Sequence, residues 1–255
     1  MRVNRRTGKL WLVLAVLIAP LPSFLKVPFY RIVFGYRIGR KVRIGLSLLI
    51  AGECEIADGA RIGHGNLVIH CQRFVMGSEA VIGFGNIIRG GRSVTLGDRC
   101  SITRFNEINS IIDADIDSGK TASAEEAGHF VLGEAGIITA QHKVDFTGGV
   151  TIGDNAILGG RLSSLWTHNR HLDGPIRIGR NTYMGSGIQM VPRSAIGDFC
   201  IVGIGSVVTK AFTSEMMLLG GNPAKEIKPL DEDSKILVTR PTRIDLEPVA
   251  GEDAA

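Results

Sequence analysis

Two histidines lie close together in one polar segment of the chain, LWTHNRHLDGPIRIG at residues 165–179. Imidazole has an unperturbed pKa near neutral pH, so a histidine can take a proton from a hydroxyl or an amine while that group attacks. His168 and His171 are therefore two candidates for a general base. Asp173, in the same segment, could orient an imidazole through a hydrogen bond.

A second set of residues with chemical potential lies toward the C-terminus, in IVGIGSVVTK at residues 201–210 and GGNPAK at residues 220–225. The small residues of the first segment would let an extended ligand lie close to the backbone. Lysines and exposed backbone N–H groups are common partners of phosphates. Both segments together indicate binding of a long phosphorylated cofactor. We assign this role to Gly203, Ile204, Gly205, Ser206, Lys210, Asn222, Pro223 and Lys225.

These segments must be positioned by the rest of the chain, whose dominant feature is an aliphatic residue at every sixth position. An amphipathic helix repeats at about 3.6 residues and a half-buried strand at about 2, so neither explains this period. Stacked coils with flat sides of six residues, each side with one inward aliphatic residue, do explain it. The pattern slips near residues 64–76, 88–96, 109–131 and 164–178, where we expect loops or irregular coils, and 113–128 reads as an excursion. The period is carried by Ile38, Ile44, Ile50, Ile56, Ile62, Met76, Ile82, Ile88, Leu96, Ile102, Ile108, Leu132, Ile138, Val144, Ile152, Leu158, Ile178, Met184, Met190, Ile196, Val202 and Val208.

The repeat, the two-histidine segment and the GGNPAK ending together resemble the hexapeptide-repeat acyltransferases of the coenzyme A-dependent O-acetyltransferase type, over residues 36–228. The resemblance implies an all-β fold, a left-handed parallel β-helix, whose handedness the spacing alone does not give. It implies that acetyl-CoA is the co-substrate, that a hydroxyl or amine accepts the acyl group, and that no metal is required. His168 matches the family's general base best, and His171 is the alternative.

The resemblance also assigns roles around the thioester. Residues 183–186 occupy the place of the family's WIG-S/A segment, where a backbone N–H holds the thioester oxygen as negative charge grows. Gly185 and Ser186 are the candidates for this role, and Tyr183 would form an aromatic wall beside the cofactor. Ile204 stands where the family usually has alanine, and it could crowd the pantetheine arm. Family members form trimers with the cleft between neighbouring subunits, so we expect a homotrimer.

The acceptor is the least determined partner. His142, at the end of ITAQH, corresponds to a histidine near the acceptor pocket of similar sequences, and with Asp173 it is our candidate for substrate binding. Relatives modify sugars, amino acids, antibiotics and lipid-linked glycans. The basic, apolar start of the chain favours a small-molecule or lipid-linked sugar, as in polysaccharide biosynthesis at a membrane.

Charge is distributed unevenly. The formal net charge is +4, yet residues 1–43 contain ten Lys or Arg and no Asp or Glu. Residues 10–25 lack charge, but they are short for a membrane span and prolines 20 and 22 interrupt them. A short helix or helical hairpin in a membrane interface, with its cations facing anionic lipid, is one interpretation. Packing on the end of the core or on another subunit is the other. The balanced middle of the chain argues against a nucleic-acid partner.

We expect three parts: a basic, apolar segment at 1–35, the β-helix domain at 36–230, and a disordered tail at 231–255 that carries no repeat. The four cysteines form no CxxC pair, which favours reduced thiols in a reducing compartment. We therefore expect a cytoplasmic protein, with peripheral contact with the inner face of the cytoplasmic membrane.

Two other functions share this scaffold. The γ-type carbonic anhydrases hold zinc with three histidines, and HGNLVIHC at residues 64–71 resembles their histidine segment. The spacing is one residue too long, however, and a convincing third ligand is not apparent. A non-catalytic β-helix scaffold at the membrane is the other alternative, and it would not bind coenzyme A.

Overall fold

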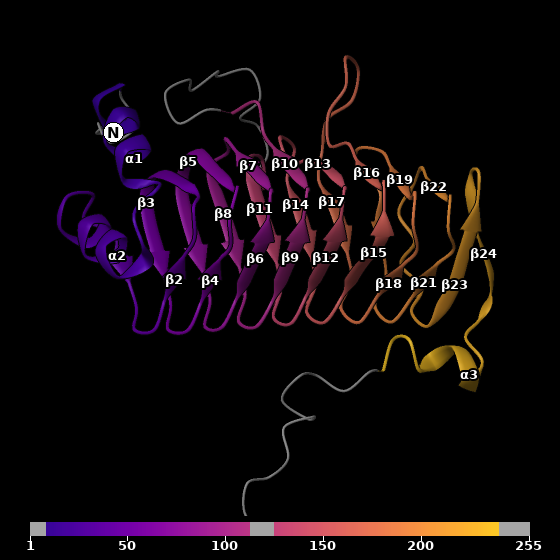
Figure 1. Ribbon diagram of the computed structural model, residues 1–255. Helices are drawn as coiled ribbons and strands as arrows, with labels where there is room; N and C mark the ends of the chain where they lie inside the picture. The colour runs from indigo at the N-terminus through magenta and orange to yellow at the C-terminus, as the bar shows by residue number, and fades with distance from the viewer. Residues whose placement is uncertain (1–8, 113–124, 240–255) are drawn as a thin grey trace, which may run out of the picture.

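The computed structural model describes residues 9–112 and 125–239, which form a β-helix of stacked three-sided coils (Figure 1). All strand pairs between successive coils are parallel, apart from the closing hairpin. The 22 residues that carry the six-residue period are all buried, with at most 8% of their surface exposed. The period therefore marks the interior. The acidic excursion expected at 113–128 falls largely on residues outside the described part of the chain.

Each coil contributes one short strand to each side. The first side consists of β1 (Arg37–Ile38), β8 (Ser93–Leu96), β11 (His129–Leu132), β14 (Val150–Ile152), β17 (Ile176–Ile178) and β20 (Ala195–Ile196). The second side consists of β2 (Arg43–Ile44), β4 (Arg61–Ile62), β6 (Val81–Phe84), β9 (Ser101–Arg104), β12 (Ile137–Ala140), β15 (Ile157–Arg161), β18 (Tyr183–Met184) and β21 (Ile201–Val202). The third side consists of β7 (Ile87–Arg89), β10 (Glu107–Asn109), β13 (Lys143–Asp145), β16 (Ser164–Leu165), β19 (Gln189–Met190) and β22 (Val207–Val208).

Two long strands, β3 (Leu48–Ile56) and β5 (Leu67–Met76), run from the third side onto the first in the early coils. At the far end the antiparallel hairpin of β23 (Met217–Gly221) and β24 (Ala224–Pro229) covers the last coil. Because the backbone hydrogen bonds run between coils, each coil depends on its neighbours for pairing.

A column of buried polar side chains follows the corner between the second and third sides. We call it the corner column; it comprises Ser47, Asn66, Asn86, Asn106, His142 and Ser163. The amides of Asn86 and Asn106 each donate to the asparagine oxygen of the coil before, both at 3.0 Å, and the amide of Asn66 donates to the hydroxyl of Ser47 at 3.3 Å. The hydrogen bonds satisfy polar groups that would otherwise be costly to bury.

Two helices cover the N-terminal end of the β-helix, α1 (Lys9–Ile18) and α2 (Ser23–Ile32) (Figure 1). Lys26 is fully buried, and its ammonium donates to the carbonyl oxygens of Ala19 and Gly45 at 2.6 and 2.5 Å. Desolvation lowers the pKa of this lysine. No helix in the described part of the chain is long and apolar enough to span a bilayer.

The end of the chain differs from the expected start of a tail at residue 231. Asp231 caps a short helix, α3 (Glu232–Lys235), by accepting a hydrogen bond from the backbone N–H of Ser234 at 2.9 Å. Val238 is buried against Ile201 and Leu230. The structure therefore extends through residue 239, and residues 240–255 lie outside the described part.

Candidate active site

The two-histidine segment forms a loop between β16 and β17, which leaves the β-helix at the corner between the third and first sides. His168 and Asp173 pair through their backbones in antiparallel fashion, so the loop is a small hairpin. Asn169 closes its tip, because its side-chain oxygen accepts from the backbone N–H groups of His171 and Leu172, both at 2.8 Å. The hairpin holds His168 at its base and His171 at its exposed tip.

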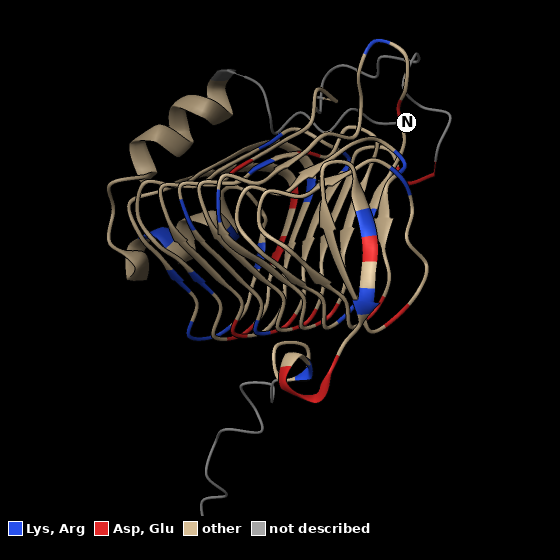
Figure 2. Ribbon diagram, turned by 90° about the vertical axis from the view of Figure 1, so that its right-hand side faces the viewer, with Lys and Arg blue, Asp and Glu red and all other residues tan. Residues whose placement is uncertain are grey.

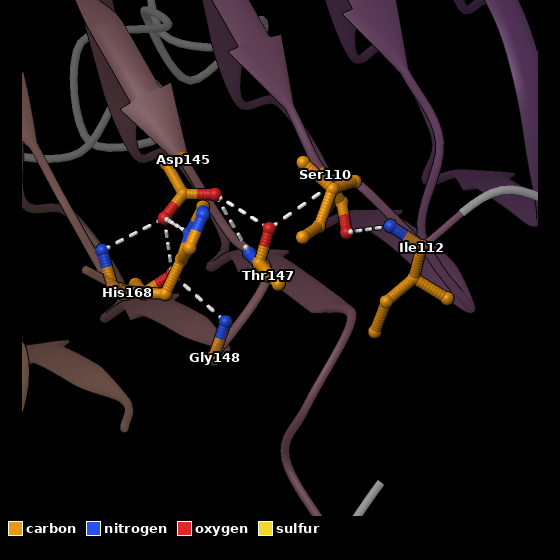
Figure 3. Close-up of polar contacts among 8 residues, drawn as sticks. Ser110, Ile112, Asp145, Thr147, Gly148 and His168 are labelled. Carbon is orange, nitrogen blue, oxygen red and sulfur yellow. Dashed lines mark hydrogen bonds and ion pairs between the residues drawn. The ribbon is translucent and has the colours of Figure 1, made fainter. Parts of the chain in front are cut away.

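The imidazole of His168 meets a carboxylate from the preceding coil. Its Nδ1 lies 2.7 Å from Oδ2 of Asp145, the last residue of β13 (Figure 3). The Asp145 side chain is 8% exposed and that of His168 is 32% exposed. The carboxylate is thus buried behind an imidazole that still reaches the surface.

Asp145 accepts four further hydrogen bonds. Its Oδ2 accepts from the backbone N–H and the hydroxyl of Thr167, at 2.9 and 2.7 Å. Its Oδ1 accepts from the backbone N–H and the hydroxyl of Thr147, at 3.1 and 2.6 Å. A carboxylate that is an acceptor in every contact leaves Nδ1 of His168 as a donor, so the proton of the neutral ring lies on Nδ1. Nε2 then carries the free lone pair, which is the arrangement a general base requires.

The two threonines are themselves held by backbone N–H groups, one in the preceding coil and one in the coil of Asp145. The hydroxyl of Thr147 accepts from the backbone N–H of Ile111 at 3.1 Å, and that of Thr167 accepts from the N–H of Gly148 at 2.8 Å (Figure 3). A Cβ on Gly148 would lie 2.7 Å from the carbonyl oxygen of Thr167, so only glycine fits between the loop and the coil. The carboxylate is therefore fixed by neighbours that are themselves hydrogen-bonded.

The structure separates the other loop candidates from this pair. The ring of His171 is exposed at the hairpin tip, with no side-chain partner among the described residues. The carboxylate of Asp173 faces Arg193 instead of an imidazole, with 3.9 Å between Oδ1 and Nη2. Asp145 takes the orienting role for which the sequence had suggested Asp173.

His142 belongs to the interior. Its ring is fully buried, Nδ1 accepts from the backbone N–H of Ser163 at 3.1 Å, and Nε2 lies 2.9 Å from the hydroxyl of Thr139. Desolvation lowers its pKa to about 4, against a smaller opposing effect of the carbonyl of Gly160. His142 continues the column that asparagines form in earlier coils, so the structure gives no support to the acceptor-pocket role expected for it.

The two segments expected to bind the cofactor come together at the far end. Residues 203–206 form the corner between the second and third sides, and a Cβ on Gly203 would lie 4.0 Å from Cα of Gly220 in the closing hairpin. Asn222 and Pro223 form the turn of this hairpin, joined by a cis peptide bond, and Lys225 follows exposed on β24.

Within this corner the residues differ in accessibility. Gly205 has open space around its Cα, and the side chain of Ile204 is 78% exposed beside it. Ser206 is fully buried, and its hydroxyl donates to the carbonyl oxygen of Gly203 at 2.6 Å. Ser206 therefore faces the interior, with the buried Ile188 between it and Ser163 of the corner column, and its side chain does not face a ligand on the surface.

The remaining predicted residues lie apart. Residues 183–186 lie on the second side and at its following corner, and the backbone N–H of Gly185 already donates to Val202 at 2.9 Å. Tyr183 packs with the apolar group of Ile201 and Leu230. Lys210 follows β22, at the corner where His168 lies two coils earlier, and its ammonium lies over the ring of Phe212. One copy of the chain does not bring Lys210, Lys225 and His168 to one corner.

The histidine segment that resembled a zinc-binding motif is split by the fold. His64 lies at the corner after β4, His70 lies within β5, and Cys71 is fully buried. Across the residues that the structure describes, no three His, Cys, Asp or Glu side chains gather where they could hold a metal ion.

Sequence reasoning missed Asp145, Thr147 and Thr167. Asp145 lies 23 residues before His168, in the segment KVDFTGG, which looks like an ordinary turn. The position of Asp145 could have been found by counting residues from one coil to the next. Val144 pairs with Leu165, so the residues that follow each of them lie close together. The phase slip at 164–178 hid that pairing.

Known proteins with sequences similar to parts of this chain include acetyltransferases. A candidate acetyltransferase of Staphylococcus aureus is 40% identical over 60 residues, which are 24% of this chain and 30% of that protein. The galactoside O-acetyltransferase of Escherichia coli is 32% identical over 101 residues, which are 36% of this chain and 48% of that protein. The chain thus spans less than half the length of these relatives. No family model matches the chain.

Among solved structures, the UDP-N-acetylglucosamine acyltransferase LpxA of Bacteroides fragilis superposes with a TM-score of 0.51 at 16% identity. The match covers 80% of this chain and 72% of that one. This likeness concerns the fold alone, and it confirms the left-handed parallel β-helix. The sequence relatives are acetyltransferases, in agreement with the resemblance that the repeat had indicated.

Proposed function

We propose that this protein transfers an acetyl group, or another short acyl group, from acyl-CoA to a hydroxyl or amine of a sugar, with His168 as the general base. The observation that carries the proposal is the hydrogen bond between His168 and the buried Asp145. The acetyltransferase relatives give the reaction class.

The chemistry follows from the orientation of the ring. Nε2 of His168 takes the proton of the acceptor hydroxyl or amine as its oxygen or nitrogen attacks the thioester carbon. The resulting imidazolium is stabilised by Asp145, whose carboxylate accepts a hydrogen bond from Nδ1–H throughout and is not itself protonated. When the tetrahedral intermediate collapses, the C–S bond breaks and the imidazolium returns the proton to the departing coenzyme A sulfur. The residue that supplies an N–H to the thioester oxygen is Ser186, since the N–H of Gly185 is already hydrogen-bonded to Val202.

Coenzyme A binds along the corner after the second side, over Gly203 and Gly205 and beside the closing hairpin. Lys225 faces one of its phosphates. Small residues line this corner in the preceding coils as well, and they leave room for the pantetheine arm; they are Gly160, Gly185, Ser186 and Gly187. Ile204 stands in the path of the arm and narrows it.

The proposed assembly is a homotrimer. His168 lies at the corner after the third side, whereas the cofactor residues lie at the corner after the second side. A neighbouring copy can place its His168 beside the cofactor of the first, and the separation of the two corners within one chain supports such an arrangement. Lys210, which shares the corner of His168, would then reach a cofactor held by the neighbour.

The proposed acceptor is a sugar or a lipid-linked glycan intermediate, modified at the cytoplasmic face of a membrane. The support is the basic start of the chain and the exposed apolar residues on the helices that cover this end. The proposed contact region is residues 1–43, of which the structure describes residues 9–43.

The test is release of coenzyme A from acetyl-CoA across a panel of free sugars, aminosugars and lipid-linked sugars. We expect turnover with at least one sugar, and identification of the acetylated product by mass spectrometry distinguishes transfer to oxygen from transfer to nitrogen. Thermal unfolding with and without coenzyme A provides the control. A protein that is neither stabilised by coenzyme A nor active on any acceptor would be a scaffold, and the proposal would be wrong.

A further inference from the structure

A basic groove lies at the N-terminal end of the β-helix, between α2 and the corner that joins the first and second sides. The cavity has a volume of about 1270 Å³. One acidic side chain, Glu79, lines it, together with six cations. Figure 2 shows several Lys and Arg segments on the coils at the end of the β-helix where the helices lie. The cations are Arg31, Arg40, Lys41, Arg43, Arg61 and Arg99.

Three of these cations are engaged by the protein itself. Arg31 donates to the carbonyl oxygens of residues 38 and 39, Arg40 pairs with Asp58, and Arg99 pairs with Glu134. Their charges are partly balanced, and their side chains are held in place. These three arginines form fixed parts of the groove lining.

Arg43 and Arg61 have no such partner among the described residues. They occupy directly paired positions on β2 and β4, and both side chains are exposed. Neither forms an ion pair with any carboxylate of the described residues. Like charges opposite each other on neighbouring strands destabilise a sheet. An anion bound between the two guanidinium groups would remove that repulsion, and guanidinium matches the geometry of phosphate oxygens.

An apolar groove of about 700 Å³ adjoins the basic one along the outer face of the second side. The two cavities share Ser23, Arg43, Arg61 and Val81 as a common wall. Beyond this wall the apolar groove is lined mainly by glycines and by apolar side chains such as Leu21, Leu46 and Phe84, together with His64, Thr103 and Arg104. A ligand that fills both grooves must therefore carry a negative charge at one end and an apolar chain at the other.

Helix α2, which lines the basic groove, and α1, which precedes it, present apolar side chains to solvent. Phe24 of α2, which lines the basic groove, is 74% exposed, and on α1 the side chains of Leu10, Val13 and Leu17 are more than half exposed. Exposed apolar side chains next to a cluster of cations are the features of a helix that lies in a bilayer interface. The observations favour a bilayer as the source of the amphiphilic ligand.

We propose that the junction of the two grooves binds an anionic phospholipid of a bilayer. The lipid phosphate lies between Arg43 and Arg61, an acyl chain lies in the apolar groove, and Phe24 and the exposed face of α1 enter the interface. This rests on the membrane part of the proposed function and gives it a specific site. It is independent of the transfer chemistry at His168.

The test uses the full chain in a vesicle sedimentation assay without acetyl-CoA. Vesicles of phosphatidylcholine alone are compared with vesicles that also contain phosphatidylglycerol. The test variant is Arg43→Gln/Arg61→Gln, and Arg177→Gln/Arg180→Gln, which removes the same charge from the later coils, is the control. Each cation near an anionic membrane surface adds to the attraction, so we expect the test variant to bind anionic vesicles at least about tenfold more weakly. The control should stay within about twofold of the wild type, since electrostatic attraction falls off with distance from the surface.

A third variant, Phe24→Ser, tests the apolar part and should weaken binding to both kinds of vesicle. Equal loss in the two arginine pairs would mean attraction by net charge alone, and the proposal would be wrong. Binding of soluble glycerol 1-phosphate that is as tight as vesicle binding, and is lost in the test variant, would assign the site to a free phosphate and would also overturn it.

Light scattering measures the particle mass of each variant, and circular dichroism measures whether each variant is folded. A change in particle mass in the test variant, with vesicle binding retained, would make the groove an interface between copies and refute the lipid site. Turnover of a soluble sugar by the test variant should equal that of the wild type, so failure of the lipid site is separable from failure of the proposed transferase.

Discussion

The carboxylate of Asp145 and the imidazole of His168 are 23 residues apart in the chain, and Oδ2 and Nδ1 are 2.7 Å apart in space. They meet because β13 and β16 are neighbours on the third side of the β-helix, with Val144 paired to Leu165. The acid thus comes from one coil and the base from the loop of the next. Consequences for catalysis and for stability can be measured separately.

Replacement of the proposed base should abolish most of the activity. His168→Ala is expected to lower kcat by about 10²–10⁴-fold, the usual contribution of a positioned general base. His171→Ala removes an imidazole three residues away at the exposed hairpin tip, and it should change kcat little. Steady-state coenzyme A release measures both. If the two variants exchanged their effects, His171 would be the base.

Asp145→Asn tests the orientation of the ring while it preserves the size of the side chain. An amide can donate toward Nδ1, which favours the tautomer with its proton on Nε2 and blocks proton uptake there. A loss of about 10²–10⁴-fold in kcat is expected, since the analogous change in serine proteases costs about 10⁴-fold. Asp173→Asn is the matched control. A fully active Asp145→Asn enzyme would show that the carboxylate has no part in the reaction.

Thr167 should matter for stability through one backbone group. Its hydroxyl accepts from the N–H of Gly148 and donates to Asp145. Thr167→Val leaves that buried N–H without a partner, which costs about 1–3 kcal/mol of the free energy of unfolding. Urea unfolding measures this, with Thr167→Ser as the variant that keeps the hydroxyl and with exposed Thr151→Val as the control. A stable Thr167→Val protein would mean that water or backbone movement satisfies Gly148.

His142 should make the stability of the fold depend on pH. Burial lowers its pKa from 6.5 in the unfolded chain to about 4 in the folded state. Between these values the unfolded chain binds a proton that the folded chain does not. The free energy of unfolding should therefore be highest above pH 6.5 and fall by up to about 1.4 kcal/mol per pH unit as the pH drops toward 4.

His142→Asn continues the asparagine column and removes this titration. Its unfolding free energy, measured in urea from pH 7 to pH 4, should show a smaller slope than that of the wild type. The exposed His171→Asn should keep the wild-type slope. Identical slopes in wild type and His142→Asn would show that the buried ring does not resist protonation.

Ile204→Ala should improve the affinity for the cofactor. The isoleucine is 78% exposed at the proposed cofactor corner, so its removal creates no cavity in the core. We expect a lower KM for acetyl-CoA with little change in unfolding free energy. Ile236→Ala, at the 71% exposed residue after α3, is the control. An unchanged KM would move the pantetheine arm away from residue 204.

The six-residue period predicted the interior well, because every coil must place an aliphatic side chain inward and all 22 such residues are buried. The loop of His168 was also visible as a break in that period. Asp145 was not, since its role depends on which coil pairs with which, and a loop of irregular length lies between the two. The interior role of His142 was equally hidden, because the sequence does not distinguish a histidine that replaces an asparagine in a buried column from a histidine that acts in catalysis or binding.

The aliphatic filling is nearly the same at every level of the β-helix, so a chain displaced by one whole level would still bury comparable side chains. The unique polar groups would not tolerate that displacement, since Asp145 would then face the wrong turn and His142 would stand beside the wrong amide. Catalytic activity is therefore a more sensitive measure of the correct register between coils than the compactness of the protein is. A misaligned population would have the same sedimentation and light scattering as the native protein, and it would be recognised by its lack of activity in the transfer assay.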